Sequence, residues 1–169
     1  MHTFLIRSFE AGEWAAWRTL RLAALADAPY AFSASLADAQ ARPDATWAAL
    51  LAKTVASPVD LPLLAECDGQ PAGLAWAQDN EGIVNAYQVW VAPAYRGRGI
   101  AQALMERGIG WARERRASAV ELGVTKLDTP AFRLYQRLGF EAWGAAVPMA
   151  NRPAFEEQPM RLRLDGGSG

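Results

Sequence analysis

One stretch decides the fold: Gln88-Val89-Trp90-Val91-Ala92-Pro93-Ala94-Tyr95-Arg96-Gly97-Arg98-Gly99-Ile100-Ala101. Its first part is rich in β-branched and aromatic residues and predicts a strand that ends before Pro93. A short basic loop with two glycines follows, and a long helical pattern begins after it. The start of a helix presents unpaired backbone N–H groups and the positive end of the helix dipole. The stretch therefore predicts a binding site for a phosphate or pyrophosphate.

The composition predicts one globular domain. The chain has 169 residues, of which 51% are hydrophobic and 21% are charged, a size and balance that suit a single hydrophobic core. We expect this domain to span residues 1–165, and we expect residues 166–169, Gly-Gly-Ser-Gly, to form a flexible tail.

Charge and hydropathy exclude several classes of protein. A formal net charge of −1 argues against nucleic-acid binding through a broad basic face. The sequence has no apolar run long enough to cross a bilayer and no secretory signal at its N-terminus. Cys67 is the only cysteine, which excludes an intrachain disulfide. We expect a cytoplasmic protein that binds neither nucleic acid nor a membrane.

Hydrophobic periodicity predicts an α/β (α+β) fold: a single mixed, mostly antiparallel sheet with helices on both faces, in the order β-α-α-β-β-β-α-β-α-β-β. The expected strands cover residues 3–7, 63–67, 71–77, 83–91, 119–125, 140–147 and 155–164. The expected helices cover residues 13–26, 44–55, 99–116 and 129–138, with a short further helix within 30–41. A helical crossover joins strands 83–91 and 119–125, which predicts that they run parallel.

Local signals set the expected boundaries between these elements. Asp44 and Thr129 are expected N-caps, and a connector is expected between Pro58 and Pro62. Turns are expected at Asp68-Gly69 and over residues 79–82.

Two motifs carry a resemblance to a known family. Residues 96–101, Arg-Gly-Arg-Gly-Ile-Ala, match the pattern Gln/Arg-x-x-Gly-x-Gly/Ala. Residues 128–140, Asp-Thr-Pro-Ala-Phe-Arg-Leu-Tyr-Gln-Arg-Leu-Gly-Phe, match Asn-x-x-Ala-x-x-Leu-Tyr-x-x-Leu-Gly-Phe except at the first position. In this order and context the motifs resemble the GNAT superfamily of acyl-CoA-dependent N-acyltransferases. Either motif alone is weaker support, since an ordinary amphipathic helix capped by glycine also fits the second.

The resemblance implies acetyl-CoA as cosubstrate and no metal. The amides of Arg98, Gly99, Ile100 and Ala101 would cradle the pyrophosphate, and side chains at Gly97 or Gly99 would block its approach. Arg96 and Arg98 would add charge-assisted contacts, although both also fit an ordinary solvated loop.

The family pattern places the pantetheine arm between strands 83–91 and 119–125, which splay apart at their C-terminal ends. The arm would bond to the backbone at Val89 and Val91, and the Val91 N–H would polarise the thioester carbonyl.

The resemblance implies that Tyr135 faces the sulfur of CoA and protonates the leaving thiolate. The pKa of a phenol is about 10 and that of a thiol is about 8.5, so full transfer of the proton from Tyr135 to the thiolate is uphill by about 2 kcal/mol. Tyr135 is therefore expected to act mainly as a hydrogen-bond donor, and the alternative is a core tyrosine. Asp128 replaces the family's Asn and would cap the helix and orient the arm or a water molecule.

The general base stays open among Glu81, Glu121 and Asp128, each of which also fits a surface or capping role. We expect Glu156-Glu157 to be surface charge. The tryptophans at 47, 76 and 90 fit either an acceptor pocket or the core. No Cys/His cluster has metal-ligand spacing.

The expected activity is transfer of the acetyl group of acetyl-CoA to a primary amine by direct attack, because no activated Ser or Cys nucleophile is evident. A small-molecule amine is the first hypothesis for the acceptor, and a protein or peptide amine is the second. Two alternatives remain: an acyl-CoA-binding sensor without turnover, and a nucleotide-binding module. A homodimer is an open alternative, since relatives commonly form dimers.

Overall fold

The computed structural model describes residues 3–29, 35–126, 129–149 and 152–164. The elements follow one another as β1 (Phe4–Ser8), η1 (Ala11–Glu13), α1 (Trp14–Asp27), α2 (Leu36–Ala41), α3 (Asp44–Ala56), β2 (Asp60–Cys67), β3 (Gln70–Asn80), β4 (Ile83–Val91), η3 (Pro93–Tyr95), α4 (Ile100–Glu114), β5 (Ala119–Thr125), α5 (Thr129–Arg137), β6 (Glu141–Ala142), β7 (Val147–Met149) and β8 (Arg152–Arg163).

The strands form one eight-stranded sheet in the order β1-β2-β3-β4-β5-β8-β6, and β7 pairs with β8. The β4–β5 pair is parallel, and the other strand pairs are antiparallel. The predicted fold class is therefore confirmed, with the short helix expected within residues 30–41 present as α2.

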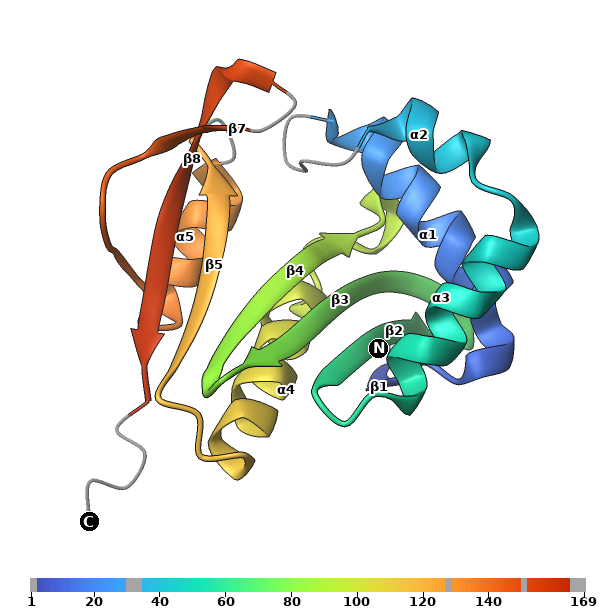
Figure 1. Ribbon diagram of the computed structural model, residues 1–169, viewed down its shortest axis with the longest axis horizontal. Coiled ribbons are helices and arrows are strands. Elements are labelled where there is room, and N and C mark those ends of the chain that lie inside the picture. Colours follow the sequence, from blue (N-terminus) through green and yellow to red (C-terminus); the bar gives the residue numbers. More distant parts are fainter. Residues whose placement is uncertain (1–2, 30–34, 127–128, 150–151, 165–169) are drawn as a thin grey trace.

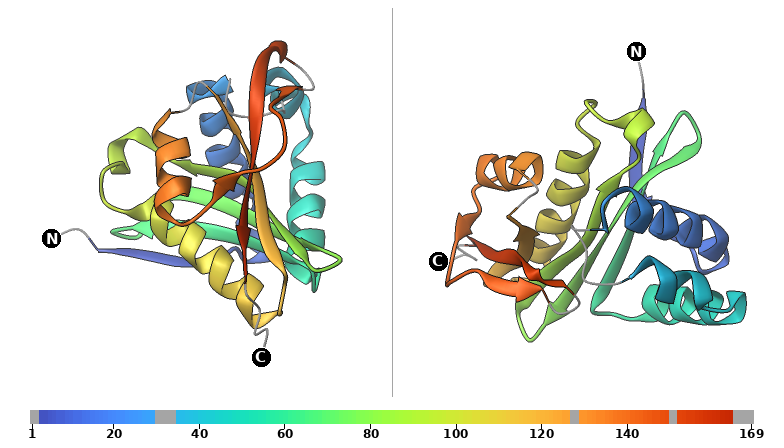
Figure 2. Two further views of the ribbon diagram at one scale, coloured as in Figure 1. Left: turned by 90° about the vertical axis from the view of Figure 1, so that its left-hand side faces the viewer. Right: turned by 90° about the horizontal axis from the view of Figure 1, so that it is seen from above.

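Helices cover both faces of the sheet. Figure 2 shows α1, α2 and α3 on one face and α4 and α5 on the other. The alternation of side chains along a strand supplies both cores: Leu63 packs in the cluster that includes Leu104 of α4, and Leu64 packs in the cluster that includes Leu20 of α1 and Leu51 of α3. Each fully buried leucine stabilises the fold by about 1.5–3 kcal/mol relative to an exposed one.

Two predictions of local structure in the first half of the chain are wrong. Pro43 is the N-cap of α3, and Asp44 is instead its first residue, where a carboxylate still complements the helix dipole. Pro62 lies inside β2 and pairs with Trp76. The pairing of β2 with β1 ends at Leu63, and the Pro62 carbonyl still accepts the Phe9 N–H at 2.8 Å. Only the missing N–H of Pro62 lies beyond this pairing, where it disturbs little.

The predicted turn at residues 68–69 is confirmed, with positive φ at Asp68 and Gly69. The turn expected over residues 79–82 is shorter than predicted: β3 runs to Asn80, and Glu81 and Gly82 take the positive φ values.

The strand expected over residues 140–147 is also wrong. It is broken into β6 and β7, and Gly144 between them has a φ of 73°, a conformation that interrupts a strand.

The sheet opens between β4 and β5. The two strands pair only from Ile83↔Ala119 to Asn85↔Glu121, and beyond these pairs they diverge (Figure 1). A bulge helps to bend β4: its register with β3 shifts between Leu74 and Trp76, and Gln88 has a φ of 59°. The predicted splay of these strands is confirmed, and it positions the site.

Candidate functional site

The loop before α4 has open space beside its two glycines. Gly97 and Gly99 have φ values of 80° and 83°, and a Cβ added at either would meet nothing within 4 Å. Gly99 is the N-cap of α4 in the left-handed conformation. Its carbonyl accepts the Ala103 N–H at 3.0 Å, so the N–H groups of Ile100 and Ala101 precede the helix's own hydrogen bonds.

This loop borders a cavity of about 510 Å³, which we call the loop cavity. Its walls come from the end of α1, the end of β4, the loop, the start of α4 and one side of α5. The lining residues are Asp27, Ala28, Val89, Trp90, Val91, Tyr95, Arg96, Gly97, Gly99, Ile100, Ala101, Gln102, Pro130, Ala131, Leu134, Tyr135 and Arg137.

The backbone of Val91 points into the opening between the strands. Ala92 donates its N–H to the carbonyl of Ala72 on the β3 side, at 2.8 Å. Strand alternation then turns the amide and carbonyl of Val91 away from β3. The carbonyl accepts a hydrogen bond from Arg96 Nε at 2.9 Å. The Val91 N–H shares this direction, and Val91 is one of the residues that line the loop cavity.

The two arginines of the loop point to different places. Arg96 donates to Asp27 Oδ2 as well as to Val91, and Trp90 Nε1 donates to the same Asp27 oxygen at 3.0 Å. The Trp90 hydrogen bond, with Arg96 adding to it, holds the pKa of Asp27 below its usual range. This Asp27–Trp90–Arg96 cluster ties α1 to the end of β4.

Arg98 turns back toward the sheet. Its Nη1 lies 3.1 Å from Cys67 Sγ, and its guanidinium lies 5.4 Å from the ring centroid of Tyr95. Arg98 is not among the described residues that line the loop cavity. Its side chain thus packs against the buried Cys67.

Tyr135 on α5 lies at the inner end of the loop cavity. Its side chain is buried, with 7% of its surface exposed, and its ring centroid lies 5.9 Å from that of Phe140. Tyr135, Val89 and Ala131 also line a second cavity, so these three residues belong to the walls of both cavities.

The second cavity, which we call the sheet cavity, has a volume of about 520 Å³. It lies in the opening between β4 and β5, with further walls from α1, β3, α5, β7 and β8. The lining residues are Arg21, Trp76, Asn85, Ala86, Tyr87, Gln88, Val89, Glu121, Leu122, Gly123, Val124, Thr125, Ala131, Tyr135, Trp143, Val147, Met149, Glu157 and Pro159.

Among the described residues, three with charged side chains line the sheet cavity. Glu121 accepts a hydrogen bond from Arg161 Nε at 2.7 Å. Glu157 is half-buried, and desolvation raises its pKa. Arg21 is buried, and desolvation, together with the nearby charge of Arg42, lowers its pKa to about 10.

A family model for the Acetyltransferase (GNAT) family matches residues 17–140. The chain belongs to the GNAT family of acetyltransferases. Among its relatives, the mycothiol acetyltransferase of Thermomonospora curvata is 33% identical over 150 residues, which cover 88% of this chain and 48% of that protein. The N-acetylaspartate synthetase of Rattus norvegicus is 33% identical over 112 residues, which cover 60% of this chain and 38% of that protein. This GNAT chain thus spans about half the length of the mycothiol acetyltransferases it matches.

Solved GNAT structures share the fold. An acetyltransferase of the GNAT family from Streptococcus pneumoniae superposes with a TM-score of 0.81 at 21% identity, covering 96% of this chain and 99% of that one. An acetyltransferase from Salmonella typhimurium, solved with its cofactor acetyl-CoA, gives a TM-score of 0.78 at 22% identity, covering 99% of this chain and 97% of that one.

The GNAT site residues expected from the motifs lie as follows. Most of them line the loop cavity: Val89, Val91, Arg96, Gly97, Gly99, Ile100, Ala101 and Tyr135. Arg98 instead packs against Cys67. Asp128 lies outside the described residues.

The three expected candidates for the general base differ in position. Glu81 is exposed in the β3–β4 turn and borders neither cavity, and Glu121 lines the sheet cavity paired with Arg161. Glu157, expected as surface charge, lines the sheet cavity instead. Adjacent strand residues point to opposite faces, so one of the two neighbouring glutamates had to face inward, but the sequence alone does not tell which.

The three tryptophans also separate. Trp47 is buried in the helical layer, 5.3 Å from Trp17 between ring centroids. Trp76 lines the sheet cavity and Trp90 lines the loop cavity.

Among the described residues, no helix is long and apolar enough to cross a membrane. Within the same residues, no group of three or more His, Cys, Asp or Glu side chains is placed to hold a metal ion.

Proposed function

We propose that this chain transfers the acetyl group of acetyl-CoA to the primary amine of a small molecule by direct attack. One observation carries the proposal: two cavities of similar volume share Val89, Ala131 and Tyr135 in their walls. One has a helix N-terminus in its wall, and the other has carboxylates. A cosubstrate in the first and an amine in the second would meet beside Tyr135.

In this proposal the loop cavity takes CoA. The amides of the loop and of Ile100 and Ala101 bind the pyrophosphate, and the helix dipole adds to their attraction. The left-handed glycines Gly97 and Gly99 keep this surface free of side chains. Arg96 contributes positive charge from a side chain that the Asp27–Trp90–Arg96 cluster holds in place.

The reaction joins the amine nitrogen to the carbonyl carbon of the thioester and breaks the bond from that carbon to sulfur. The Val91 N–H stabilises the negative charge that develops on the carbonyl oxygen. The Tyr135 phenol donates a hydrogen bond to the leaving thiolate. The amine loses one proton to a base and the thiolate gains one, so the step is balanced. Alignment of the two reactants supplies much of the rate.

The dimensions of the sheet cavity favour a small acceptor. Its volume of about 520 Å³ lies within the range of about 300–1,000 Å³ that is usual for small-molecule sites. The names of two relatives, mycothiol acetyltransferase and N-acetylaspartate synthetase, also refer to small molecules.

Other features of the chain stay predictions: the single domain over residues 1–165, the flexible tail and the cytoplasmic location. The homodimer stays an open alternative.

Thermal denaturation with acetyl-CoA, followed by thiol release against a panel of amines, tests the proposal. Ligand at about 100 times its Kd should stabilise the protein by about 2.7 kcal/mol, and ATP or NAD should stabilise it less. Thiol release with a small amine would support the proposal. CoA binding without turnover on any small amine or peptide would indicate a sensor. Turnover on peptides alone would indicate a protein acetyltransferase. Stabilisation by ATP or NAD without protection by CoA would indicate a nucleotide-binding module.

A further inference from the structure

The sheet cavity carries opposite charges on elements that approach it from opposite sides. Arg21 belongs to α1 and Glu157 belongs to β8, and both line the cavity. Figure 1 shows that α1 and β8 stand on either side of the opening between β4 and β5. These elements are not neighbours in the sheet, so the two charges come together only through the tertiary fold.

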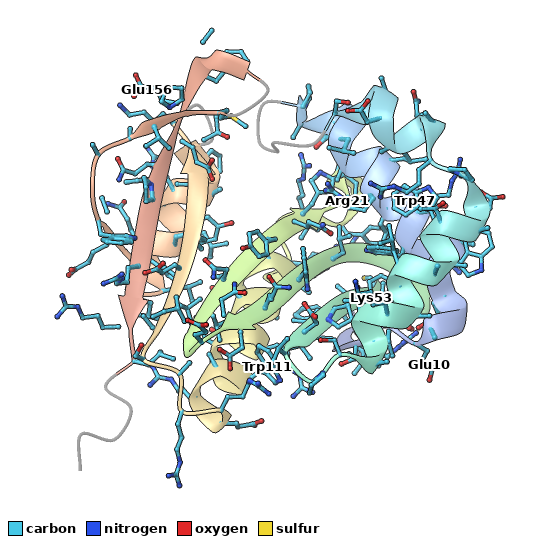
Figure 3. The ribbon with its side chains drawn as sticks, in the orientation of Figure 1. Glu10, Arg21, Trp47, Lys53, Trp111 and Glu156 are labelled. Carbon is cyan, nitrogen blue, oxygen red and sulfur yellow. The ribbon has the colours of Figure 1, made fainter. Side chains whose placement is uncertain are left out.

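Arg21 is a buried cation in the cavity wall. Only 7% of its surface is exposed, and Figure 3 shows it between α1 and the C-terminal part of β4. Burial and the neighbouring cation Arg42 disfavour its charged form and lower its pKa to about 10, so it still carries its proton at neutral pH. An anion bound beside Arg21 would relieve this cost, because opposite charges favour the charged form.

Glu157 is a half-buried carboxylate on the opposite wall. It lies over Gly123 of β5, where a Cβ on the glycine would come within 1.6 Å of Glu157 Oε1. Within the described part of the chain, no cation is paired with Glu157, whereas its neighbour Glu156 pairs with Lys126 at 3.3 Å. Figure 3 shows Glu156 on the outer side of β8. A bound ammonium would offset the desolvation that raises the pKa of Glu157.

The rest of the wall adds little net charge. Glu121 is paired with Arg161, whose guanidinium also lies 3.7 Å from the ring centroid of Trp143. Trp76 and Tyr87, with ring centroids 5.0 Å apart, form an aromatic part of the wall. Within the part of the chain that the structure describes, the cavity therefore offers one cationic place, one anionic place and an apolar surface.

We infer that the acceptor is a small zwitterion: a primary amine that also carries an anionic group, with its ammonium end at Glu157 and its anionic end at Arg21. The ammonium releases one proton to solvent before the neutral nitrogen attacks, and the second proton that it loses balances the one gained by the thiolate. This inference rests on the proposed function and specifies the acceptor class for the same site. Amino acids and their derivatives have this chemistry, and so do amines that carry a phosphate. A guanidinium binds carboxylates and phosphates alike through charge-assisted hydrogen bonds.

The test compares matched acceptors that differ only in the anion. Thiol release from acetyl-CoA is measured with α-, β- and γ-amino acids against their carboxamides, and with O-phosphoethanolamine against ethanolamine. We expect kcat/KM to be about 10- to 100-fold higher for the charged member of at least one pair, the range expected for a charge-assisted hydrogen bond. The carboxylate and phosphate pairs show which anion the site takes.

Variants then assign the effect to residues. Arg21→Met should raise KM for the preferred anionic acceptor about 10- to 100-fold and leave KM for its neutral partner and for acetyl-CoA nearly unchanged. Arg21→Lys keeps the charge and should lose less. Arg18→Met is the control from the same helix, because Arg18 pairs with Asp44 at 3.6 Å and is absent from the residues that line the cavity; it should keep the preference. Glu157→Gln should raise KM for both members of each pair, and the Glu156→Gln control should not.

Each outcome decides the inference. Preference for the anionic acceptor that is lost in Arg21→Met and kept in Arg18→Met supports it. Equal turnover of charged and neutral partners overturns it while the proposed function stands. Equal loss for both partners in a folded Arg21→Met variant also overturns it. If Arg21→Met does not fold, the comparison of Arg21→Lys with wild type decides in its place. Binding of acetyl-CoA without turnover of any acceptor overturns the proposed function, and the inference with it.

Discussion

The two cavities that share Tyr135 in their walls are built in different ways. The loop cavity takes most of its wall from one contiguous segment, residues 89–102, and its chemistry comes from backbone amides and two glycines. The sheet cavity takes its wall from α1, β3, β4, β5, α5, β7 and β8, and its chemistry comes from charged and aromatic side chains. One cavity depends on local chain geometry, and the other depends on how distant elements pack.

This difference bears on specificity. A site made of backbone groups tolerates many side chains, so it suits a cosubstrate common to a whole family. A site made of side chains from several elements changes with each substitution, so it suits an acceptor that differs between relatives. Substitutions in the walls of each cavity test this division of roles.

Gly99→Glu should abolish binding at the loop cavity. The new carboxylate would enter the space that we assign to the pyrophosphate and repel it, because the Cβ at this position faces open space. We expect affinity for CoA to fall by at least about 100-fold, which corresponds to about 2.7 kcal/mol. Isothermal titration calorimetry with CoA measures the change, and circular dichroism checks that the fold survives.

Two controls separate the charge from the backbone. Gly99→Ala has the same left-handed strain without the carboxylate, and Gly82→Ala adds similar strain in the β3–β4 turn, at a position that lines neither cavity. Both should retain more affinity than Gly99→Glu. Full affinity in Gly99→Glu would overturn the assignment of the loop to the pyrophosphate.

Tyr135→Phe tests a residue that belongs to the walls of both cavities. The ring should still fill its buried position beside Phe140, while the hydrogen bond to the leaving thiolate is lost. We expect kcat to fall by about 10- to 100-fold, at or below the low end of the range of about 100- to 10,000-fold for acid–base groups, with little change in affinity for acetyl-CoA. Tyr95→Phe removes a phenol at the loop end of the same cavity and should leave kcat unchanged. An unaltered kcat in Tyr135→Phe would exclude the phenol from the reaction.

The sequence predicted the loop cavity better than the sheet cavity, because the first depends on local chain geometry and the second on how distant elements pack. The strand, the glycine loop and the helix that follows it are determined by neighbours in the chain, so residues 89–101 could be assigned from their order. The direction of Arg98 could not, because its partner Cys67 lies on a distant strand. The positive φ of Gln88 could not either, because an ordinary residue seldom adopts that conformation.

The acceptor side depends on contacts that no local pattern contains. Arg21 stands among leucines and alanines on a helix whose apolar stripe is otherwise ordinary, and its exposure depends on the elements packed around it. The direction of Glu157 follows from the pairing of β8 with β5 and from the space above Gly123. Similarly, β6 and β7 replace one expected strand because Gly144 interrupts it, and Trp143 and Val147 beside it reach the sheet cavity as a result.

Asp27→Ala should lower the thermal stability of the protein, because it disrupts hydrogen bonds in the wall of the loop cavity. The substitution leaves Trp90 Nε1 and Arg96 without their common acceptor, and an unsatisfied, partly buried donor costs about 1–3 kcal/mol. We expect Tm to fall by about 2–12 °C, since 1 kcal/mol shifts Tm by about 2–4 °C in a domain of this size. Asp44→Ala, at an exposed ion pair, should change Tm little. Equal Tm values for Asp27→Ala and wild type would exclude a stabilising role for this cluster.

The stabilising effect of Asp27 should depend on pH in a defined direction. Trp90 and Arg96 lower the pKa of Asp27 in the folded state, so its contribution is complete above the unfolded value of about 3.9 and is lost as the pH falls through the folded pKa. Wild type should therefore lose its advantage over Asp27→Ala in acid. A difference in unfolding free energy that stays constant from neutral to strongly acidic pH would contradict this.

Glu157→Gln should have the smallest effect, and in the opposite direction. Burial raises the folded-state pKa of Glu157, so the folded protein holds this proton to higher pH than the unfolded chain does. Its ionisation therefore costs stability as the pH rises through the unfolded value, about 4.3, and the cost is complete above the folded pKa. The neutral glutamine avoids this cost, and we expect the unfolding free energy at neutral pH to rise by less than about 1 kcal/mol.

The pH dependence separates this cause from a general effect of glutamine. The gain should shrink as the pH falls below about 4.3, where the unfolded carboxyl is itself protonated, and the exposed Glu156→Gln should show no gain because Glu156 pairs with Lys126 at the surface. A gain that is equal at every pH, or a loss at neutral pH, would contradict a desolvated carboxylate at this position. A gain at neutral pH that disappears in acid means that the sheet cavity keeps its carboxylate charged at a cost to the apoprotein. No such cost is expected in the loop cavity, where the binding groups are backbone amides.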